Sequence, residues 1–344
     1  MKLIEFRSIL RKKKIDLVWL SSPDPNITYF TQQAFDPAIL LVTQRSAVVY
    51  VSALDKAKPI KGVTIRHFKL GWQKKISHNR AISLGVNKDK LTVATYEGLK
   101  KLFPKARFVD ISKDVTVLRT TKTSAEINKI AKACTITDNA FSSFVKKFNR
   151  RKFKTEQDVA LFLEDSIKSQ GGGVGFPTIV AMGKNAAVPH HKVSLTPLKR
   201  GFLLMDFGAS YKNYNADMTR MVFLGKPTKA EREMYGLLLK AQESAIETAS
   251  KGVTYGELDS VSRKILGKYD KQFTHALGHG IGIDVHESPR VGGGSKEKIE
   301  RGHVFTIEPG VYFPGKYGLR IEDTLVFDGK TKILTKSSKK LISL

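Results

Sequence analysis

The sequence predicts two domains of different fold class, an α/β domain over residues 1–119 and an α+β domain over residues 120–344. Three observations support this prediction. The 344 residues exceed the usual size of a single domain. The first third of the chain alternates helical and strand-like segments, as α/β domains do, whereas the remainder groups helices and strands in blocks, which favours an α+β domain. The pattern changes around residues 117–123, and we therefore place the boundary near residue 120.

The first domain is expected to contain a partly parallel sheet. Residues 3–10 have the spacing of an amphipathic helix. The apolar runs at residues 15–20 and 47–51 are typical of short strands, and two more strands are predicted at residues 91–94 and 107–111. Because Lys-rich helical stretches adjoin the last two runs, helix and strand alternate, which favours parallel pairing.

The second domain is expected to contain helices that begin at capping boxes. In a capping box, a threonine side chain bonds the backbone of the residue three positions later, and the acidic side chain of that residue bonds back. After the first box, apolar residues recur at helical spacing over residues 127–144. The predicted boxes start at Thr123, Thr155, Thr228 and Thr254. Strands are predicted at residues 202–207, 219–224, 303–307 and 319–327.

The composition is that of an ordinary globular protein. Apolar residues make up 41% and charged residues 26%, so a sizeable core can form. The longest apolar run, residues 38–42, is far shorter than the roughly 18 residues of a membrane span, and the first residues carry charges where a secretion signal would be apolar. The single cysteine, Cys134, excludes an internal disulfide. We therefore expect a cytoplasmic protein without membrane contact.

The charge is strongly positive, with 59 Lys and Arg against 32 Asp and Glu, a formal net charge of +27. Clustered cations can bind nucleic acid by releasing counterions from phosphates. Here the basic residues are spread over the whole chain, and the densest run, residues 146–154, is interpreted as a solvated junction between two helices. A nucleic-acid partner is therefore not expected.

Four acidic residues lie within predicted strands or at their ends. Asp206 ends an apolar run, where a carboxylate is costly to bury unless it is paired or bound to a metal. Asp217 follows eleven residues later and opens the next strand, so a hairpin could bring both acids side by side. Glu308 ends another apolar run, and Glu322 follows fourteen residues later in a further strand. A second hairpin of similar size would therefore present a second pair of acids.

Histidines add nitrogen ligands to this pattern. A histidine alone is more often a core or surface residue, but His279 lies between two glycines, whose small size lets other groups approach. Four carboxylates that lie close together cannot all ionise unless cations neutralise them, and two divalent ions supply the matching charge. Such a site suits Mn²⁺, Co²⁺, Fe²⁺ or Zn²⁺, and the sequence does not choose among them.

These motifs resemble those of the aminopeptidase P and Xaa-Pro dipeptidase (prolidase) family of metallopeptidases. The resemblance implies a pita-bread fold for the catalytic domain, because that is the family's fold. It covers most of residues 120–328, with the motifs in the family's order. The matching stretches are residues 176–180 and 189–191, 205–208, 216–220, 278–287, 306–310 and 320–323.

The first domain also resembles the family's N-terminal domain, chiefly through residues 25–29. Two departures from the family pattern stand out. Residues 201–206 form an approach to the first Asp that is one residue shorter than usual, and Gln32 stands where a glycine is expected. Neither departure removes a predicted ligand.

The resemblance implies a role for each metal ligand. Asp217 and Glu322 would bridge two divalent ions, Asp206 would bind one of them, and His279 and Glu308 would bind the other. The implied nucleophile is a water or hydroxide held between the metals. Glu308 would take its proton and help deliver it to the leaving amine.

The resemblance also implies residues that serve the substrate. His190 and His286 would line the site and stabilise the tetrahedral intermediate or the leaving proline nitrogen. His275 would line the site as well, while Arg320 and Thr219 would contact and orient the acids. His191, next in sequence to His190, is expected to lie behind the site.

The implied reaction is hydrolysis of the peptide bond that precedes proline. Proline lacks an N–H and so resists general proteases, which depend on hydrogen bonds to the substrate backbone. A dipeptidase must also hold a free carboxylate, for which Arg290 is a candidate, although an exposed loop arginine is an equally good interpretation. Because the chain has the length of compact prolidases, we favour an Xaa-Pro dipeptidase over an Xaa-Pro aminopeptidase that acts on longer peptides. A homodimer is implied as well.

Three other interpretations rank lower. Methionine aminopeptidases share the fold but usually lack a first domain of this size. Creatinase-like relatives do not keep the five ligands. A basic binding protein with the pita-bread fold and no catalytic activity would fit the charge of +27, but it would not need four acids and a histidine in this pattern.

Overall fold

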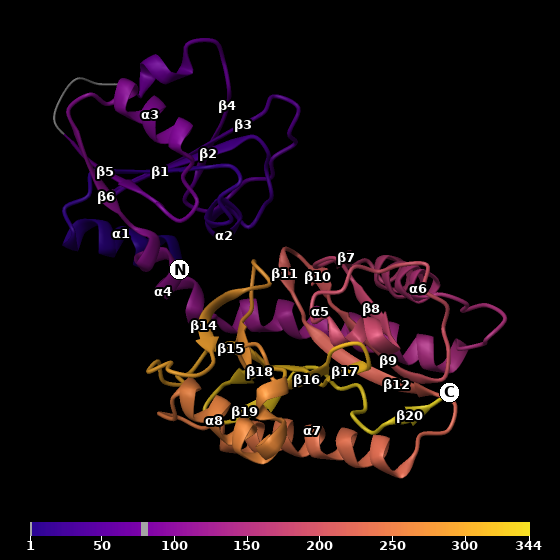
Figure 1. Cartoon of the computed structure of the whole chain (residues 1–344). Helices are drawn as coiled ribbons and strands as arrows, with labels where there is room; N and C mark the ends of the chain where they lie inside the picture. Colours follow the sequence, from indigo (N-terminus) through magenta and orange to yellow (C-terminus); the bar gives the residue numbers. More distant parts are fainter. Residues whose placement is uncertain (1, 77–81) are drawn as a thin grey trace. The chain divides into compact units, whose positions relative to one another are not determined.

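The computed structural model describes residues 2–76 and 82–344. By its internal contacts the chain forms two compact units, Met1–Arg119 and Thr120–Leu344, and both are drawn in Figure 1. In the described part of the chain, no helix combines the length and the apolar composition needed to cross a membrane.

The first unit is built on a mixed sheet (Figure 1). Its strands are β1 (Leu17–Ser21), β2 (Ala38–Thr43), β3 (Ala47–Val51), β4 (Thr64–His67), β5 (Ile82–Val86) and β6 (Ala106–Asp110). They lie in the order β4-β3-β2-β1-β5-β6. β1 pairs antiparallel with β2 and parallel with β5, and β5 pairs parallel with β6. The predicted partly parallel sheet is therefore confirmed.

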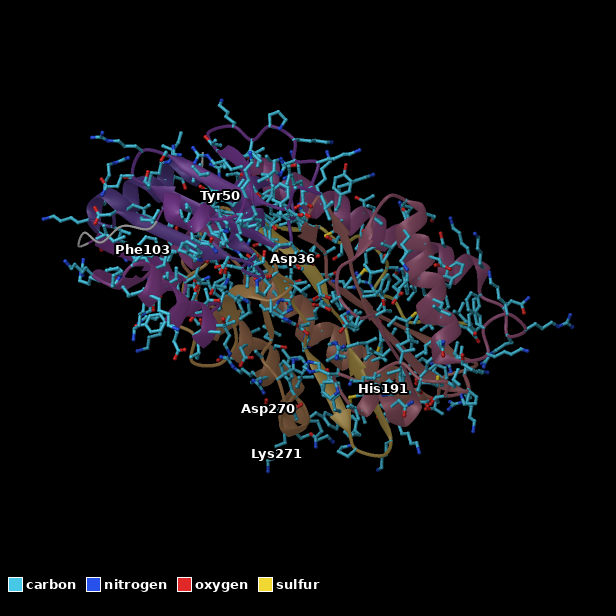
Figure 2. The ribbon with its side chains drawn as sticks, turned by 90° about the horizontal axis from the view of Figure 1, so that it is seen from above. Asp36, Tyr50, Phe103, His191, Asp270 and Lys271 are labelled. Carbon is cyan, nitrogen blue, oxygen red and sulfur yellow. The ribbon has the colours of Figure 1, made fainter. Side chains whose placement is uncertain are left out.

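Helices and aromatic side chains complete the first unit. Its helices are α1 (Lys2–Lys12), α2 (Asn26–Thr31), α3 (Val93–Leu102), α4 (Ser112–Thr120) and the 3₁₀ turn η1 (Trp72–Lys75). Trp19 of β1 packs with its ring centroid 6.0 Å from that of Trp72 and 6.4 Å from that of Phe103. Tyr50 adds a fourth ring, 4.9 Å from Trp72; Tyr50 and Phe103 are labelled in Figure 2.

The strand predicted at residues 91–94 is wrong, because this segment begins helix α3. Thr92 is the N-cap of the helix, and its side chain accepts a hydrogen bond from the backbone N–H of Thr95. β-Branched residues favour strands, which explains the prediction, but a threonine hydroxyl that caps the first turn favours a helix start. Strands β2, β4 and β5 were not predicted.

Gln32 shows why a glycine is expected at its position. It follows α2 with a φ of 58°, in the left-handed region that glycine adopts most easily at the end of a helix. Its side-chain amide donates a hydrogen bond to the carbonyl of Tyr29 at 2.7 Å. This local bond offsets part of the backbone strain that a non-glycine residue carries there.

In the second unit, two pairs of helices cover opposite faces of the strands (Figure 1). The helices are α5 (Ser124–Lys147), α6 (Glu156–Ser169), α7 (Lys229–Thr248), α8 (Tyr255–Leu266) and the 3₁₀ turns η2 (Gly183–Ala187) and η3 (Gly267–Gln272). α5 and α6 contribute to one apolar core, and α7 and α8 contribute to another. Each of these four α-helices begins at the predicted capping box, so all four predicted starts are confirmed.

The strands of the second unit are β7 (Gly173–Val174), β8 (Ile179–Met182), β9 (Gly201–Phe207), β10 (Ala209–Tyr211), β11 (Tyr214–Asn215), β12 (Met218–Leu224), β13 (Gly278–Gly280), β14 (Glu287–Val291), β15 (Val304–Ile307), β16 (Gly310–Phe313), β17 (Tyr317–Arg320), β18 (Asp323–Phe327), β19 (Thr331–Ile333) and β20 (Ile342–Ser343). Two of the sheets have the orders β20-β12-β9-β8 and β14-β13-β15-β18-β19. Helices and mainly antiparallel strands thus form the predicted α+β unit.

Both predicted hairpins are present. β9 pairs antiparallel with β12, and β15 pairs antiparallel with β18. The strand predicted at residues 319–327, however, is two strands. β17 ends at Arg320 and pairs with β16, whereas β18 begins at Asp323 and pairs with β15. The break at residues 321–322 lets the chain pass from one ladder to the other, and it places Glu322 between them.

Candidate metal centre

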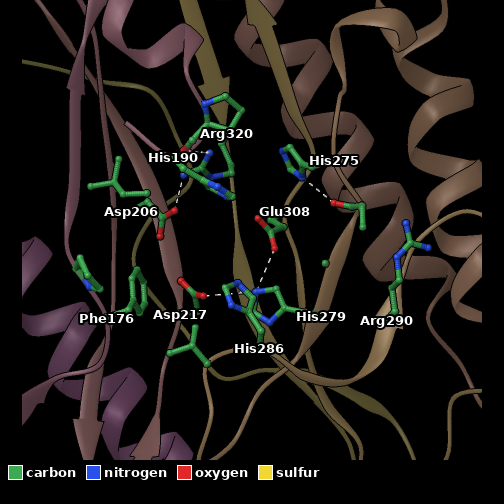
Figure 3. Close-up of a pocket in the computed structure, with 16 residues that line it drawn as sticks. Phe176, His190, Asp206, Asp217, His275, His279, His286, Arg290, Glu308 and Arg320 are labelled. Atoms are coloured by element: carbon green, nitrogen blue, oxygen red, sulfur yellow. Dashed lines mark hydrogen bonds and ion pairs between the residues drawn. The ribbon is translucent and has the colours of Figure 1, made fainter. Parts of the chain in front are cut away.

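One cavity of the second unit gathers most of the predicted site residues (Figure 3). Its volume is about 570 Å³, which is enough for a small peptide. The predicted residues that line it are Asp206, Asp217, His279, Glu308, His190, His275, His286, Arg290 and Arg320. Two predicted residues, Glu322 and Thr219, do not line it; both are buried and join the predicted ligands through the contacts given below.

The predicted ligands come from both hairpins and from a third strand. Asp206 lies in β9 opposite Thr219, and Asp217 directly precedes β12. Glu308 directly follows β15, and Glu322 directly precedes its partner strand β18. Antiparallel pairing therefore brings together the two acids of each hairpin, as the sequence predicts.

His279 lies at the middle of β13, between two glycines that allow close packing. A Cβ atom at Gly278 would lie 2.2 Å from the carbonyl oxygen of Thr306, and one at Gly280 would lie 2.1 Å from that of Ser288. Any larger residue would therefore push β13 away from its neighbours. The glycines keep the imidazole of His279 close to the hairpin acids.

Four of the predicted ligands face the same space in Figure 3: Asp206, Asp217, His279 and Glu308. His279 Nε2 lies 3.3 Å from Glu308 Oε1 and 3.6 Å from Asp217 Oδ2. One ligand atom each of Asp217, His279 and Glu322 lies within 4.8 Å of the other two. Such spacing allows several side chains to coordinate one ion.

Three of the acids each have one buried oxygen that lacks a hydrogen-bond donor among the described residues. These atoms are Asp206 Oδ1, Asp217 Oδ1 and Glu322 Oε1. A buried carboxylate oxygen without a partner is costly, by roughly 1–3 kcal/mol or more. A divalent cation is the partner that such a set of oxygens and one imidazole prefers. The residues present therefore fit divalent metal ions.

The pKa values of the acids show their mutual repulsion. Burial, followed by the charges of Glu322 and Asp206, raises the pKa of Asp217 well above its ordinary value. Burial, followed by the charges of Glu308 and Asp206, does the same to the pKa of Glu322. Burial also favours a raised pKa for Glu308, but its hydrogen bond and charge interaction with His279 outweigh this and lower it. Bound cations would remove the repulsion by stabilising the ionised acids.

Arg320 connects the acids to one another. The guanidinium is buried, and its Nη2 donates to Asp206 Oδ2. Its Nε donates to the hydroxyl of Thr219 at 3.1 Å, and that hydroxyl donates to Glu322 Oε2 at 2.8 Å. Arg320 and Thr219 are thus placed to orient one acid of each hairpin.

Two predicted residues of the cavity, His275 and Arg320, contact the hydroxyl of Tyr312. His275 Nε2 lies 2.8 Å from the hydroxyl of Tyr312, which also accepts a hydrogen bond from Arg320 Nη1 at 2.8 Å. Burial is the main reason that the pKa of His275 is lowered, so a neutral imidazole is favoured. Tyr312 was not predicted, because its position in β16 is that of an ordinary buried strand residue.

The other predicted residues of the substrate side are exposed. The ring of His286 lies 4.3 Å from that of His279. Arg290, in β14, donates a hydrogen bond to the carbonyl of Gly293 at 3.1 Å. His190 lies in the connection between η2 and β9. All three line the cavity, where a peptide could reach them.

No role was assigned from the sequence to two further parts of the site. An apolar wall is formed by Phe176, Pro177, Ile179 and Val285. Thr306 accepts a hydrogen bond from the backbone N–H of His279 at 3.1 Å and donates one to Glu308 Oε1 at 3.2 Å. A threonine in an apolar strand is a weak sequence signal, because threonine also favours strands for its shape alone.

A buried ionic network lies behind Glu322. Arg220 donates to the carbonyl of Glu322 and, at 2.6 Å, to the carboxylate of Asp323. Asp323 also lies 3.1 Å from Lys339 Nζ. The carbonyl of Ser337 accepts from Arg220 Nη2 at 2.9 Å. Residues after β19 thus help to fix the backbone that carries Glu322.

Known proteins match the whole chain. Residues 128–328 match metallopeptidase family M24, and residues 2–121 match the creatinase/prolidase N-terminal domain. The Xaa-Pro dipeptidase of Pyrococcus horikoshii is 36% identical over 349 residues, which cover 99% of this chain and 97% of that protein.

Solved structures agree with the sequence comparisons. A prolidase from Pyrococcus horikoshii has a TM-score of 0.90 at 34% identity, with 99% of each chain covered. An X-Pro aminopeptidase from Thermotoga maritima has a TM-score of 0.88 at 31% identity, covering 96% of this chain and 98% of that one. The resemblance and the fold predicted from the sequence are confirmed. The chain therefore belongs to metallopeptidase family M24 and carries a creatinase/prolidase N-terminal domain ahead of a pita-bread catalytic domain.

Proposed function

We propose that this protein is an Xaa-Pro dipeptidase, which hydrolyses the peptide bond before proline, with residues 1–119 as its N-terminal domain and residues 120–344 as its catalytic domain. The main support is the set of buried carboxylate oxygens without donors among the described residues, gathered beside His279 at a cavity of about 570 Å³. Relatives named Xaa-Pro dipeptidase match over nearly their full length, which agrees with this assignment.

Five side chains would hold two divalent ions, with Asp217 and Glu322 shared between them. The remaining ligands would be Asp206 for one ion and His279 with Glu308 for the other. A site rich in carboxylates suits Mn²⁺ or Co²⁺, and Zn²⁺ or Fe²⁺ are compatible with the same ligands. Bound ions of this kind act as Lewis acids that lower the pKa of water and polarise a carbonyl group.

The chain's own residues would then move the protons and hold the substrate. Glu308 would accept a proton and return it to the leaving nitrogen. Its carboxylate lines the cavity beside His279, which supports this role. His190 and His286 would donate hydrogen bonds to the oxyanion or to the leaving proline nitrogen. Arg320 and Thr219 would hold the acids in place.

A second candidate is an Xaa-Pro aminopeptidase that acts on longer peptides. The Thermotoga maritima X-Pro aminopeptidase is nearly as similar in structure as the prolidase. A dipeptidase must bind the free carboxylate of its substrate, and Arg290, exposed at the cavity, is the proposed partner. If Arg290 stays bonded to the carbonyl of Gly293, that carboxylate loses this partner, and longer peptides would be accepted equally well.

The test compares the dipeptide Met-Pro with a tripeptide that has proline second, with Mn²⁺ and Co²⁺ assayed separately. Faster hydrolysis of the dipeptide, together with about two divalent ions per chain by elemental analysis, would support the dipeptidase. A preference for the tripeptide would support the aminopeptidase instead. Absence of hydrolysis of either peptide with each metal would refute both.

A further inference from the structure

The loop that carries His190 closes on one buried carboxylate. Residues 183–196 leave β8 and return beside the first turn of α6, where the backbone N–H of Glu156 donates to the carbonyl of Thr196 at 3.1 Å. The N–H of Gln157 donates to the carbonyl of Ser194 at 3.2 Å. Glu156 follows the N-cap of α6, and its side chain is fully buried within this loop.

The carboxylate of Glu156 forms hydrogen bonds with residues at both ends of the loop and in its middle. Oε1 accepts from the backbone N–H of Met182 and from the side chain of Asn185, both at 2.8 Å. Oε2 accepts from the hydroxyl of Ser194 at 2.7 Å and from its backbone N–H at 3.2 Å. His191 Nε2 lies 2.9 Å from the same oxygen. The charge is thus almost surrounded by donors from the loop.

Helix α6 does not need this carboxylate. The capping box is formed by Thr155 and Asp158, whose side chains bond the backbone at the helix start. An exposed acid in the first turn would already interact favourably with the helix dipole, whereas burial of an acid costs free energy unless donors replace water. Burial alone would raise the pKa of Glu156, but its hydrogen bonds, first that of the Met182 N–H, lower it. The loop therefore accounts for the burial of Glu156.

The loop reaches the cavity at Pro189 and His190. Both residues line the cavity, and Arg320 Nη1 donates to the carbonyl of Pro189 at 3.3 Å. The imidazole of His190 is exposed, and no described residue forms a hydrogen bond with it. Its position is therefore set by the backbone around it. His191, the next residue, is bound to Glu156 and does not line the cavity; it is labelled in Figure 2.

We propose that Glu156 is a positioning residue for catalysis: by holding Ser194 and His191, it fixes the loop so that His190 faces the substrate. This inference rests on the proposed peptidase function, because only that function gives His190 a substrate. Arg320 holds the loop on the cavity side, and Glu156 holds it from behind.

The test uses the full chain with its metal and the substitution Glu156→Gln. The amide keeps the size of the side chain but removes the charge and can no longer accept from both sets of donors. Asp165→Asn is the matched control, since it makes the same chemical change at an exposed site on the same helix. Ser194→Ala, which removes one donor only, serves as a milder second variant if Glu156→Gln folds poorly.

Three measurements are made on each variant: kcat and KM for Met-Pro, metal content, and deuterium uptake of residues 183–196. Glu156→Gln should lower kcat/KM on the order of tenfold or more, speed up deuterium uptake in this loop and leave the metal content unchanged. In a His190→Ala background the same substitution should lower kcat/KM little further, because its effect acts through His190. The control should change none of these values.

Two results would overturn the inference: unchanged deuterium uptake in the loop, or an equal loss of activity with and without His190. If the unsubstituted protein cleaves no Xaa-Pro peptide, the proposed function fails, and with it the role in catalysis. The deuterium uptake then still decides whether Glu156 anchors the loop, because that measurement does not depend on activity.

Discussion

Glu308 differs from the other predicted carboxylate ligands in its hydrogen bonds. Its Oε1 accepts from Thr306 at 3.2 Å and lies 3.3 Å from His279 Nε2. The other three acids each have a buried oxygen without a donor among the described residues. Thr306 and His279 thus orient the carboxylate of Glu308, and no buried oxygen of it lacks a partner among the described residues, which suits a group that must exchange a proton at a fixed place.

Glu308→Gln is expected to abolish turnover while the fold is retained. The amide has the same shape but cannot take up a proton at neutral pH, so the loss in kcat should be about a hundredfold or more. Thermal unfolding should stay close to that of the unsubstituted protein. The exposed α7 substitution Glu243→Gln is the control and should be fully active. Near-normal activity of Glu308→Gln would remove Glu308 as the base.

Asp217→Ala is expected to release at least one divalent ion per chain. Asp217 directly precedes β12, and its carboxylate lies 3.6 Å from His279 Nε2, so its removal takes away a ligand that both ions are proposed to share. Elemental analysis after dialysis measures the effect. Unchanged metal content would show that Asp217 is no shared ligand.

From the surroundings of His303 we predict a pH dependence of folding stability that does not involve the candidate metal centre. Its buried Nδ1 accepts a hydrogen bond from the backbone N–H of Glu300 at 3.3 Å, and the hydroxyl of Tyr255 lies 2.9 Å away. A backbone N–H can only donate, so Nδ1 carries no proton. Burial, followed by the charge of Lys122, lowers the pKa of His303 from 6.5 to about 4.

Stability should therefore fall as the pH decreases from about 6.5 to about 4. In this window the unfolded state binds a proton that the folded state excludes, and each unit of pKa difference corresponds to about 1.4 kcal/mol. Above about pH 6.5, His303 is largely unprotonated in both the folded and the unfolded state, so its effect no longer lowers the stability. His303→Gln should lower stability at neutral pH and flatten the pH dependence in urea unfolding. An identical pH slope in both proteins would contradict this account.

At the scale of helices and strands, the sequence predicted an element well where a single capping residue sets its start. The four threonines that begin capping boxes each start a helix in the second unit. Threonine was misleading at residues 91–94, where a strand was predicted. Thr92 instead caps helix α3 by accepting a hydrogen bond from the backbone N–H of Thr95, and the residue three positions after Thr92 is not acidic. Without an acidic partner three residues later, the β-branched composition was the stronger sequence signal.

The sequence predicted which acids lie together at the candidate site, but not the residues that support them. Burial of an acid at the end of an apolar strand costs free energy unless the acid is paired or binds a metal, so Asp206 and Glu308 stood out in the sequence. The supporting groups have ordinary explanations: Tyr312 as a strand residue and Glu156 as an acid in the first turn of a helix. Only the fold shows that loop residues distant in sequence bond Glu156. Long-range polar contacts of this kind leave no local pattern.

Gly208→Ala tests how closely the first hairpin must pack. A Cβ at Gly208 would lie 1.8 Å from the carbonyl oxygen of Ala216, between the two acids of the hairpin. The strands must shift apart, which should cost about 1–3 kcal/mol of stability and weaken metal binding. Gly236→Ala on α7 is the control, because no described atom beyond the neighbouring helix backbone lies within 4 Å of the added carbon.

The control should gain up to about 1 kcal/mol, since alanine favours helices over glycine. Urea unfolding measures both changes, and a competition titration with a chelator measures metal affinity. If Gly208→Ala binds metal as tightly as the unsubstituted protein, the spacing of Asp206 and Asp217 does not depend on this close contact.

At the scale of the whole molecule, the formal charge of +27 opposes self-association. We nevertheless expect a homodimer, as the family resemblance implies. Because salt screens like charges, the dimer should become tighter as ionic strength rises. Sedimentation velocity at low and physiological salt measures this. The mass of a single chain at every salt concentration and at micromolar protein would contradict the expectation.

The network behind Glu322 has a consequence for translation. Ser337 and Lys339 follow every other member of this network in the order of synthesis, and they complete the contacts of Arg220 and Asp323. While these residues are still inside the ribosome, two buried charges lack part of their partners, and the segment that carries Glu322 lacks this part of its support. Fragments from interrupted translation should therefore be inactive, which an assay of a chain ended at residue 334 would check.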